Sequence, residues 1–305
     1  MSRWAGALVG ILALLVAASG VSACRAVGKG AASGGGSGPV RVVAAENFYG
    51  GLVRDIGGDR VAVTSVLSNP DADPHLFEAG SGVELAVSRA GLVVANGAGY
   101  DDWMSKLLAA TPSSTRKTLT VARVMGVKGA DPNPHLWYDT PKLPALVRAI
   151  GSRLATLDPA HASGYRVGVK RTITSLQPLL AAVRNLRAVA SGAPVAYTER
   201  VPGLLLQAAE LRVLTPPSFA RAVEDGTDPS PVDVRAMEQL LQRHKVRALL
   251  YNEQAVTPVT DRLRQLAQAH GVPVVPVTET QPSGRSFVDW QVAQVRALES
   301  AVGSR

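Results

Sequence analysis

Two of the five histidines occur in nearly the same short sequence. His75 lies in DPHLF (73–77) and His135 lies in NPHLW (133–137). In each segment a proline fixes the backbone before the histidine, and the apolar and aromatic residues after it can pack into a core. An imidazole held in this way loses little entropy when it binds a metal ion. The repeated motif therefore favours two metal ligands over the alternative, two turn histidines that cap their own loops.

Two glutamates follow apolar, strand-like runs in the second half of the chain. Glu199 lies in YTER (197–200), and Glu279 lies in VTET (277–280). Ligands of open α/β sheets gather at the carboxyl ends of the strands. Two neutral imidazoles and two carboxylates would balance the charge of one divalent cation. The alternative is that the glutamates cap the next helices or pair with Arg200 and Arg285 at the surface.

The elements that must position these residues alternate short β-branched runs with longer amphipathic segments, a pattern typical of α/β proteins. The expected strands are residues 41–45, 61–67, 91–95, 119–121, 194–197, 212–214, 246–251 and 272–277. The expected helices between and after them are residues 48–56, 83–86, 103–108, 233–244, 259–270 and 287–302. The sequence thus predicts two similar lobes, each with a parallel-type sheet and flanking helices.

The two halves are joined by residues 141–189, which carry no strand signal. The segment is broken at Asp158-Pro159 and then continues with apolar residues near a period of 3.6. We therefore expect a single long connecting helix. The predicted organisation is an N-terminal metal-binding lobe (40–140), linking helices (141–190) and a C-terminal metal-binding lobe (191–305).

The first 39 residues have the composition of a leader and a tether. Residues 1–23 contain one arginine, an apolar stretch shorter than a membrane-spanning helix, and then small residues, which predicts a secretory signal peptide. The junction VSAC (21–24) resembles the lipobox of bacterial lipoproteins, so we expect lipid on Cys24, the only cysteine of the chain. Residues 24–39 are rich in glycine and serine and predict a flexible tether. The alternative is an ordinary signal peptide with a chance cysteine at the cut.

The composition narrows the function further. Of 305 residues 46% are hydrophobic and 18% are charged, which excludes a mainly disordered chain. The net charge of +8 comes from basic residues scattered along the sequence, without the blocks expected of a nucleic-acid-binding protein. We expect a monomer that does not bind nucleic acid.

A series of motifs resembles the zinc/manganese solute-binding lipoproteins of bacterial metal ABC importers. In chain order they are AENFY (45–49), DPH (73–75), NG (96–97) followed by DW (102–103), PHLW (134–137), and PVV (273–275) leading into TET (278–280). The resemblance runs from Val40 to the C-terminus. It implies two lobes that meet at a cleft, one long helix between them, two metal ligands from each lobe, and an ABC permease with its ATPase as partners. It also implies a location at the outer face of the cell membrane or in the periplasm.

The resemblance places the four ligands of a single ion on His75, His135, Glu199 and Glu279, the last at a position that is commonly aspartate. Two features differ from the typical zinc members of this family and bear on which metal is carried. Residues 125–133 lack the histidine-rich insertion of many zinc members, and the third ligand is glutamate, as in manganese-type members. Zn²⁺ nevertheless binds most nitrogen and oxygen sites more tightly than Mn²⁺. The expected cargo is Zn²⁺, with Mn²⁺ as the alternative.

Two other function classes fit part of this sequence. A secreted zinc hydrolase could use two histidines and a carboxylate, with Glu279 as the base. However, the chain has neither a His-Glu-x-x-His segment nor a nucleophile elbow, and we expect no enzymatic activity. A surface adhesion lipoprotein would suit the basic charge.

Overall fold

The computed structural model describes residues 38–69, 77 and 79–303, and these residues belong to one compact unit. The predicted signal peptide, Cys24, most of the tether and His75 lie outside the described residues. In the part of the chain that is described, no helix has both the length and the apolar character needed to cross a membrane.

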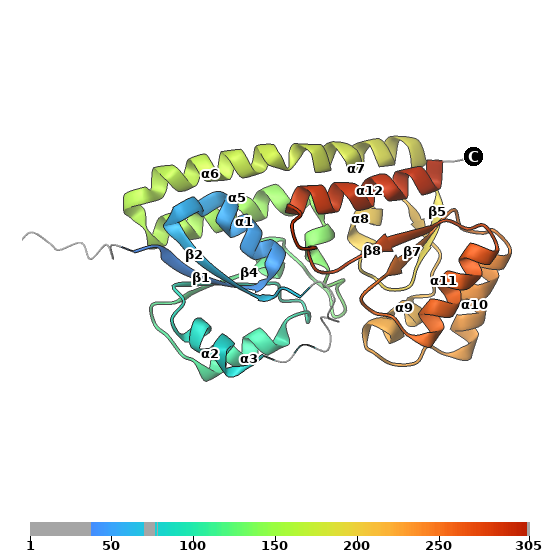
Figure 1. The fold of residues 1–305 in the computed structure, drawn as a ribbon, viewed down its shortest axis with the longest axis horizontal. Helices are drawn as coiled ribbons and strands as arrows, with labels where there is room; N and C mark the ends of the chain where they lie inside the picture. Colours follow the sequence, from blue (N-terminus) through green and yellow to red (C-terminus); the bar gives the residue numbers. More distant parts are fainter. Residues whose placement is uncertain (1–37, 70–76, 78, 304–305) are drawn as a thin grey trace, which may run out of the picture. The chain divides into compact units, whose positions relative to one another are not determined.

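The front lobe, residues 40–124, contains a four-stranded parallel sheet in the order β2-β1-β3-β4 (Figure 1). Val42 is paired with Val63 of β2 on one side and with Leu92 of β3 on the other. The strands are β1 (Val40–Glu46), β2 (Val61–Leu67), β3 (Leu92–Ala95) and β4 (Lys117–Thr120). The helices are α1 (Asn47–Gly57), α2 (Ser81–Ser88), α3 (Asp102–Ala110) and α4 (Val121–Val124).

The rear lobe, residues 194–303, repeats this topology with the order β6-β5-β7-β8, again wholly parallel. Its strands are β5 (Pro194–Tyr197), β6 (Arg212–Val213), β7 (Leu249–Asn252) and β8 (Val274–Val277). Its helices are α8 (Gly203–Ala208), α9 (Pro217–Glu224), α10 (Pro231–Gln242), α11 (Pro258–Ala269) and α12 (Phe287–Gly303). The α/β class with two similar parallel lobes is therefore confirmed.

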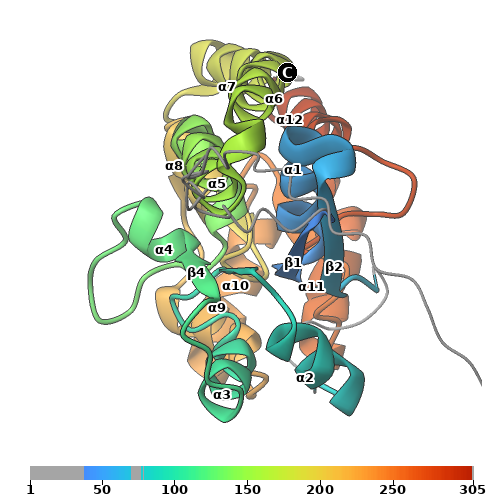
Figure 2. The same cartoon turned by 90° about the vertical axis from the view of Figure 1, so that its left-hand side faces the viewer.

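Three helices link the lobes: α5 (Leu143–Leu157), α6 (Ala162–Ser175) and α7 (Gln177–Ala190). The expected long connecting helix is present as α6 and α7, which follow one another along one side of both sheets (Figures 1 and 2). Leu176 interrupts it because Pro178 has no N–H to donate to the preceding turn. The predicted break at Asp158-Pro159 separates α5 from α6.

A continuous apolar core joins the linking helices to both lobes. Phe48 of α1 packs against Trp137 and Trp290, with ring centroids 4.5 and 6.0 Å apart. All three rings are at most 2% exposed. In addition, α12 of the rear lobe packs along α7. Close packing on both sides of the junction holds the carboxyl ends of the two sheets in a fixed relation.

The expected strands differ from the observed ones mainly at their ends. The strand expected at 119–121 is β4, which ends at Thr120 because Val121 begins α4. The strand expected at 246–251 is β7, which begins at Leu249 and includes Asn252. The short helices α8 and α9 were not expected from the sequence; each is stabilised by burying apolar residues in the tertiary structure.

Candidate metal centre

His135, Glu199 and Glu279 come together between the lobes, and their possible ligand atoms lie within 4.8 Å of one another. His135 Nε2 is 3.7 Å from Glu199 Oε1 and 3.4 Å from Glu279 Oε2. The three side chains are at most 1% exposed. His75, the fourth residue expected at this point, is not among the described residues.

The turn that carries His135 is anchored by the apolar residues after it, as its sequence predicted. Leu136, Trp137 and Tyr138 form a 3-10 helix and are at most 1% exposed. On the other side of the turn, the Asn96 side chain donates a hydrogen bond of 2.9 Å to the carbonyl of Pro134. The imidazole is therefore fixed from both sides, and little ordering remains to be done when it binds an ion.

Asn133 sets the protonation pattern of His135. Its Oδ1 accepts hydrogen bonds from the backbone N–H of His135 at 3.0 Å and from the ring Nδ1 at 2.9 Å. Its Nδ2 donates to the carbonyl of Arg200 at 2.7 Å, which fixes the orientation of the amide. Because Oδ1 can only accept, the ring proton is on Nδ1 and the lone pair of Nε2 faces the glutamates. Asn133 also ties the histidine turn to the segment that carries Glu199.

Glu199 is turned inward at the end of β5. Its neighbour Arg200 pairs with Glu224 through two hydrogen bonds of 2.7 Å and with Asp131 at 3.1 Å. The alternative from sequence, a surface pair between Glu199 and Arg200, therefore does not describe this protein. Instead, Glu199 Oε2 accepts a 2.6 Å hydrogen bond from the buried amide of Asn252.

The loop that carries Glu279 is fixed by contacts from the rear lobe and from the linking region. Within the rear lobe, Gln254 Oε1 accepts the backbone N–H groups of Glu279 and Thr280 at 2.6 and 3.0 Å. From the linking region, the Tyr138 hydroxyl donates to the carbonyl of Thr278 at 2.8 Å. Glu279 thus has a constrained backbone on each side of its side chain, which suits a preformed ligand.

Tyr100 reaches across from the front lobe to Glu279. Its hydroxyl donates a 3.0 Å hydrogen bond to Oε2, the oxygen that faces His135. Burial, and then the charge of Glu279, raise the pKa of Tyr100 well above 10, so the phenol stays protonated and remains a donor. The loop before it turns through Gly97, whose φ of 73° favours glycine, and is held by Asp101, which accepts the N–H groups of residues 96 and 97.

The donor set and its spacing fit a divalent metal ion. Hydrogen-bonded nitrogen and oxygen atoms lie about 2.7–3.2 Å apart. In a tetrahedral site with bonds of about 2.0–2.2 Å, adjacent donor atoms lie roughly 3.3–3.6 Å apart. The observed 3.4 Å lies within the second range and the observed 3.7 Å lies just above it, and both exceed a hydrogen-bond distance. Two buried carboxylates and a neutral imidazole also carry two negative charges that a divalent ion would neutralise.

A further buried carboxylate, Glu46, ends β1 in the front lobe. It is fully buried, and neither oxygen has a hydrogen-bond partner among the residues that the structure describes. Burial, and then the neighbouring charge of Asp101, raise its pKa well above 4.5. The neutral acid is therefore favoured at this position.

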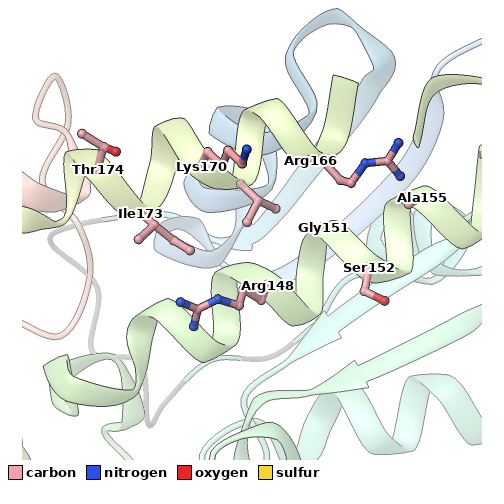
Figure 3. Close-up of a pocket in the computed structure, with 9 residues that line it drawn as sticks. Arg148, Gly151, Ser152, Ala155, Arg166, Lys170, Ile173 and Thr174 are labelled. Carbon is pink, nitrogen blue, oxygen red and sulfur yellow. The ribbon is translucent and has the colours of Figure 1, made fainter. Parts of the chain in front are cut away.

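A groove between α5 and α6, with a volume of about 800 Å³, is chemically different (Figure 3). Its described lining combines the basic residues Arg148, Arg166 and Lys170 with small and apolar side chains, and includes neither histidine nor carboxylate. This groove therefore offers no ligands for a metal cation.

The family described as ZnuA, zinc-uptake complex component A periplasmic, matches residues 42–301. The chain belongs to this family. Its match to the ZnuA family spans both lobes and the linking helices.

Relatives of this ZnuA-family chain include a putative metal-binding protein of Treponema pallidum, 23% identical over 255 residues that cover 76% of this chain and 77% of the relative. The manganese-binding lipoprotein MntA of Halalkalibacterium halodurans is 26% identical over 144 residues, 46% of this chain and 47% of that protein.

Two solved structures share the fold of this ZnuA-family chain. The periplasmic zinc-binding protein TroA of Treponema pallidum superposes with a TM-score of 0.75 at 19% identity, over 88% of this chain and 100% of TroA. FpvC of Pseudomonas aeruginosa, in complex with Mn²⁺, gives a TM-score of 0.73 at 20% identity, over 87% of this chain and 98% of FpvC.

Several residues around the centre were not singled out from sequence. Asn133 is the first residue of the NPHLW motif, directly before the proline, but its hydrogen bond to the carbonyl of Arg200 depends on the tertiary fold. Tyr100 lies between the NG (96–97) and DW (102–103) motifs. Asn252 ends a strand, the same signal that pointed to Glu199, but an amide between hydrophobic and charged residues did not stand out as a site residue.

Proposed function

We propose that this chain captures one divalent transition metal ion outside the cytoplasm and delivers it to the permease of an ABC importer. The ligands are His75 and His135 from the front of the chain and Glu199 and Glu279 from the rear lobe. The observation that carries the proposal is the spacing of His135 Nε2 from two carboxylate oxygens, 3.4 and 3.7 Å, in a fully buried site.

Membership of the ZnuA family supports transport as the purpose of this site, and relatives and fold neighbours are described as binding zinc or manganese. The proposed cargo is Zn²⁺, with Mn²⁺ as the alternative. The proposed partners are the permease and its ATPase, and the protein acts as a monomer held at the outer face of the membrane by lipid on Cys24.

The direct test is metal analysis of untagged protein purified from its native host, together with His135→Ala. We expect about one zinc or manganese ion per chain, and the substitution should weaken binding at least tens of fold because it removes a ligand. Metal-free native protein, or unchanged affinity in the variant, would contradict the proposal.

We also propose that the protein is not an enzyme. An assay for metal-dependent hydrolysis of simple esters and peptides tests this directly. Turnover that is lost when the metal is removed, and lost again in Glu279→Gln, would support the hydrolase alternative instead.

A further inference from the structure

Asn252 occupies a central place in the rear half of the centre. It is the last residue of β7, and β7 lies between β5 and β8 in the sheet. Glu199 and Glu279 each follow one of those flanking strands by two residues. Since the carboxyl ends of parallel strands meet at one edge, the sheet places the Asn252 amide between the two carboxylates.

The orientation of the amide follows from its other contacts. Asn252 Oδ1 accepts the backbone N–H of Gln254 at 3.0 Å, so Nδ2 must be the atom that faces the glutamates. The backbone N–H of Asn252 donates to the Thr198 hydroxyl at 3.1 Å, and the residue is 1% exposed. The side chain is thus locked before any ion arrives.

Asn252 Nδ2 has two hydrogens and gives one to each carboxylate. It lies 2.6 Å from Glu199 Oε2 and 2.8 Å from Glu279 Oε1. The other oxygen of each carboxylate, Oε1 of Glu199 and Oε2 of Glu279, is the one near His135 Nε2. Each glutamate therefore turns one oxygen toward the imidazole and has its second oxygen engaged by the amide.

We propose that Asn252 selects the cargo by restricting each carboxylate to one donor oxygen. This inference rests on the proposed function and on the ligand set given there. Two imidazoles and two single oxygens make four donors, the number that zinc adopts in closed sites. If the amide were absent, each carboxylate could rotate and offer both oxygens, which would raise the donor number toward six. Six-coordinate, oxygen-rich sites favour manganese.

The test compares the wild type with Asn252→Ala, which removes the amide and leaves space for the carboxylates to rotate. Affinities for Zn²⁺ and for Mn²⁺ are measured separately by competition with a chromogenic chelator. The coordination number of each bound metal is measured by X-ray absorption. Asn185→Ala, at an exposed position on α7, is the matched control.

In Asn252→Ala we expect the zinc affinity to fall about 10–100-fold, as for the loss of other groups that orient metal ligands. Manganese affinity should fall less, so that the ratio of zinc to manganese affinity falls at least about threefold, and manganese should gain oxygen ligands. Asn252→Ser, which keeps one donor hydrogen, should give an intermediate ratio and decides the question if the alanine variant does not fold.

A zinc-to-manganese ratio within about twofold of the wild type, or an unchanged coordination number, would overturn the role of Asn252 while leaving the proposed function intact. Wild-type protein that binds neither metal would instead overturn the proposed function, and this inference with it.

Discussion

The charge of Glu199 should repel Glu279 in the metal-free protein and attract the ion in the metal-bound protein. Replacing Glu199 with glutamine separates these two effects. Glutamine keeps the size of the side chain and one carbonyl oxygen but removes the negative charge. In the metal-free protein that oxygen can still accept the 2.6 Å hydrogen bond from Asn252. When a metal ion is bound, the same oxygen would have to serve both Asn252 and the ion. We therefore expect Glu199→Gln to stabilise the metal-free fold and to weaken metal binding.

The magnitude follows from the distances in the site. The candidate ligand atoms of Glu199 and Glu279 are at most 4.8 Å apart. Two unit charges at that distance repel by about 3.5 kcal/mol at an effective dielectric constant of about 20. The substitution should therefore raise the free energy of unfolding without metal by about this amount. The attraction lost in the metal-bound state is at least as large, because the ion is doubly charged, and about 3.5 kcal/mol corresponds to roughly 300-fold in affinity.

Two measurements at pH 8 check this prediction. Thermal unfolding in the presence of a strong chelator reports the metal-free stability, and each kcal/mol should raise Tm by about 2–4 °C in a chain of this size. Chelator competition reports the affinity. Glu210→Gln is the control, because Glu210 forms an exposed pair with Arg187 that should contribute little. A loss of affinity below tenfold, or a lower Tm without metal, would refute the reasoning.

Three further outcomes are expected. Asn133→Ala should weaken metal binding about 10–100-fold by freeing the His135 tautomer, whereas unchanged affinity in chelator competition would show that the ring is fixed by other contacts. Metal binding should release protons and weaken in acid, because a histidine ligand must be neutral to donate its lone pair, and calorimetry in two buffers that shows no proton release between pH 5 and 8 would contradict this. Glu46→Gln should raise the free energy of unfolding of the metal-free protein at pH 7 by about 1–3 kcal/mol. The raised pKa of Glu46 means that the folded state binds the proton of this carboxyl more tightly than the unfolded state does, so the stability of the wild type falls as pH rises above about 4.5. The gain in stability from glutamine, measured by chemical denaturation, should therefore shrink below that pH. A gain that is independent of pH would argue against an ionising Glu46.

Much of the fold could be predicted from local sequence. Strands such as Val61–Leu67 and Pro194–Tyr197 were expected with their observed boundaries, because short apolar runs rich in β-branched residues and bounded by turn residues are typical of strands. The short helices Gly203–Ala208 and Pro217–Glu224 could not be predicted in this way, since helices of this length are stabilised by what they bury and not by their own sequence.

The sequence alone determined the residue types of the candidate centre: a repeated proline-histidine turn and two glutamates placed after strands. The sequence also placed Glu199 and Glu279 at one edge of the rear sheet, because parallel strands bring their carboxyl ends together. Their meeting with His135 was implied by the resemblance to metal-binding lipoproteins, and the structure brings the three side chains together.

Only the tertiary structure decided how those side chains are held. Asn252 reaches both glutamates because β7 lies between β5 and β8, an order that local sequence does not encode. Likewise, Asn133 and Tyr100 reach the rear lobe across more than sixty residues of intervening chain. Hydrogen bonds between distant segments depend on how whole elements pack, and no pattern of neighbouring residues specifies them.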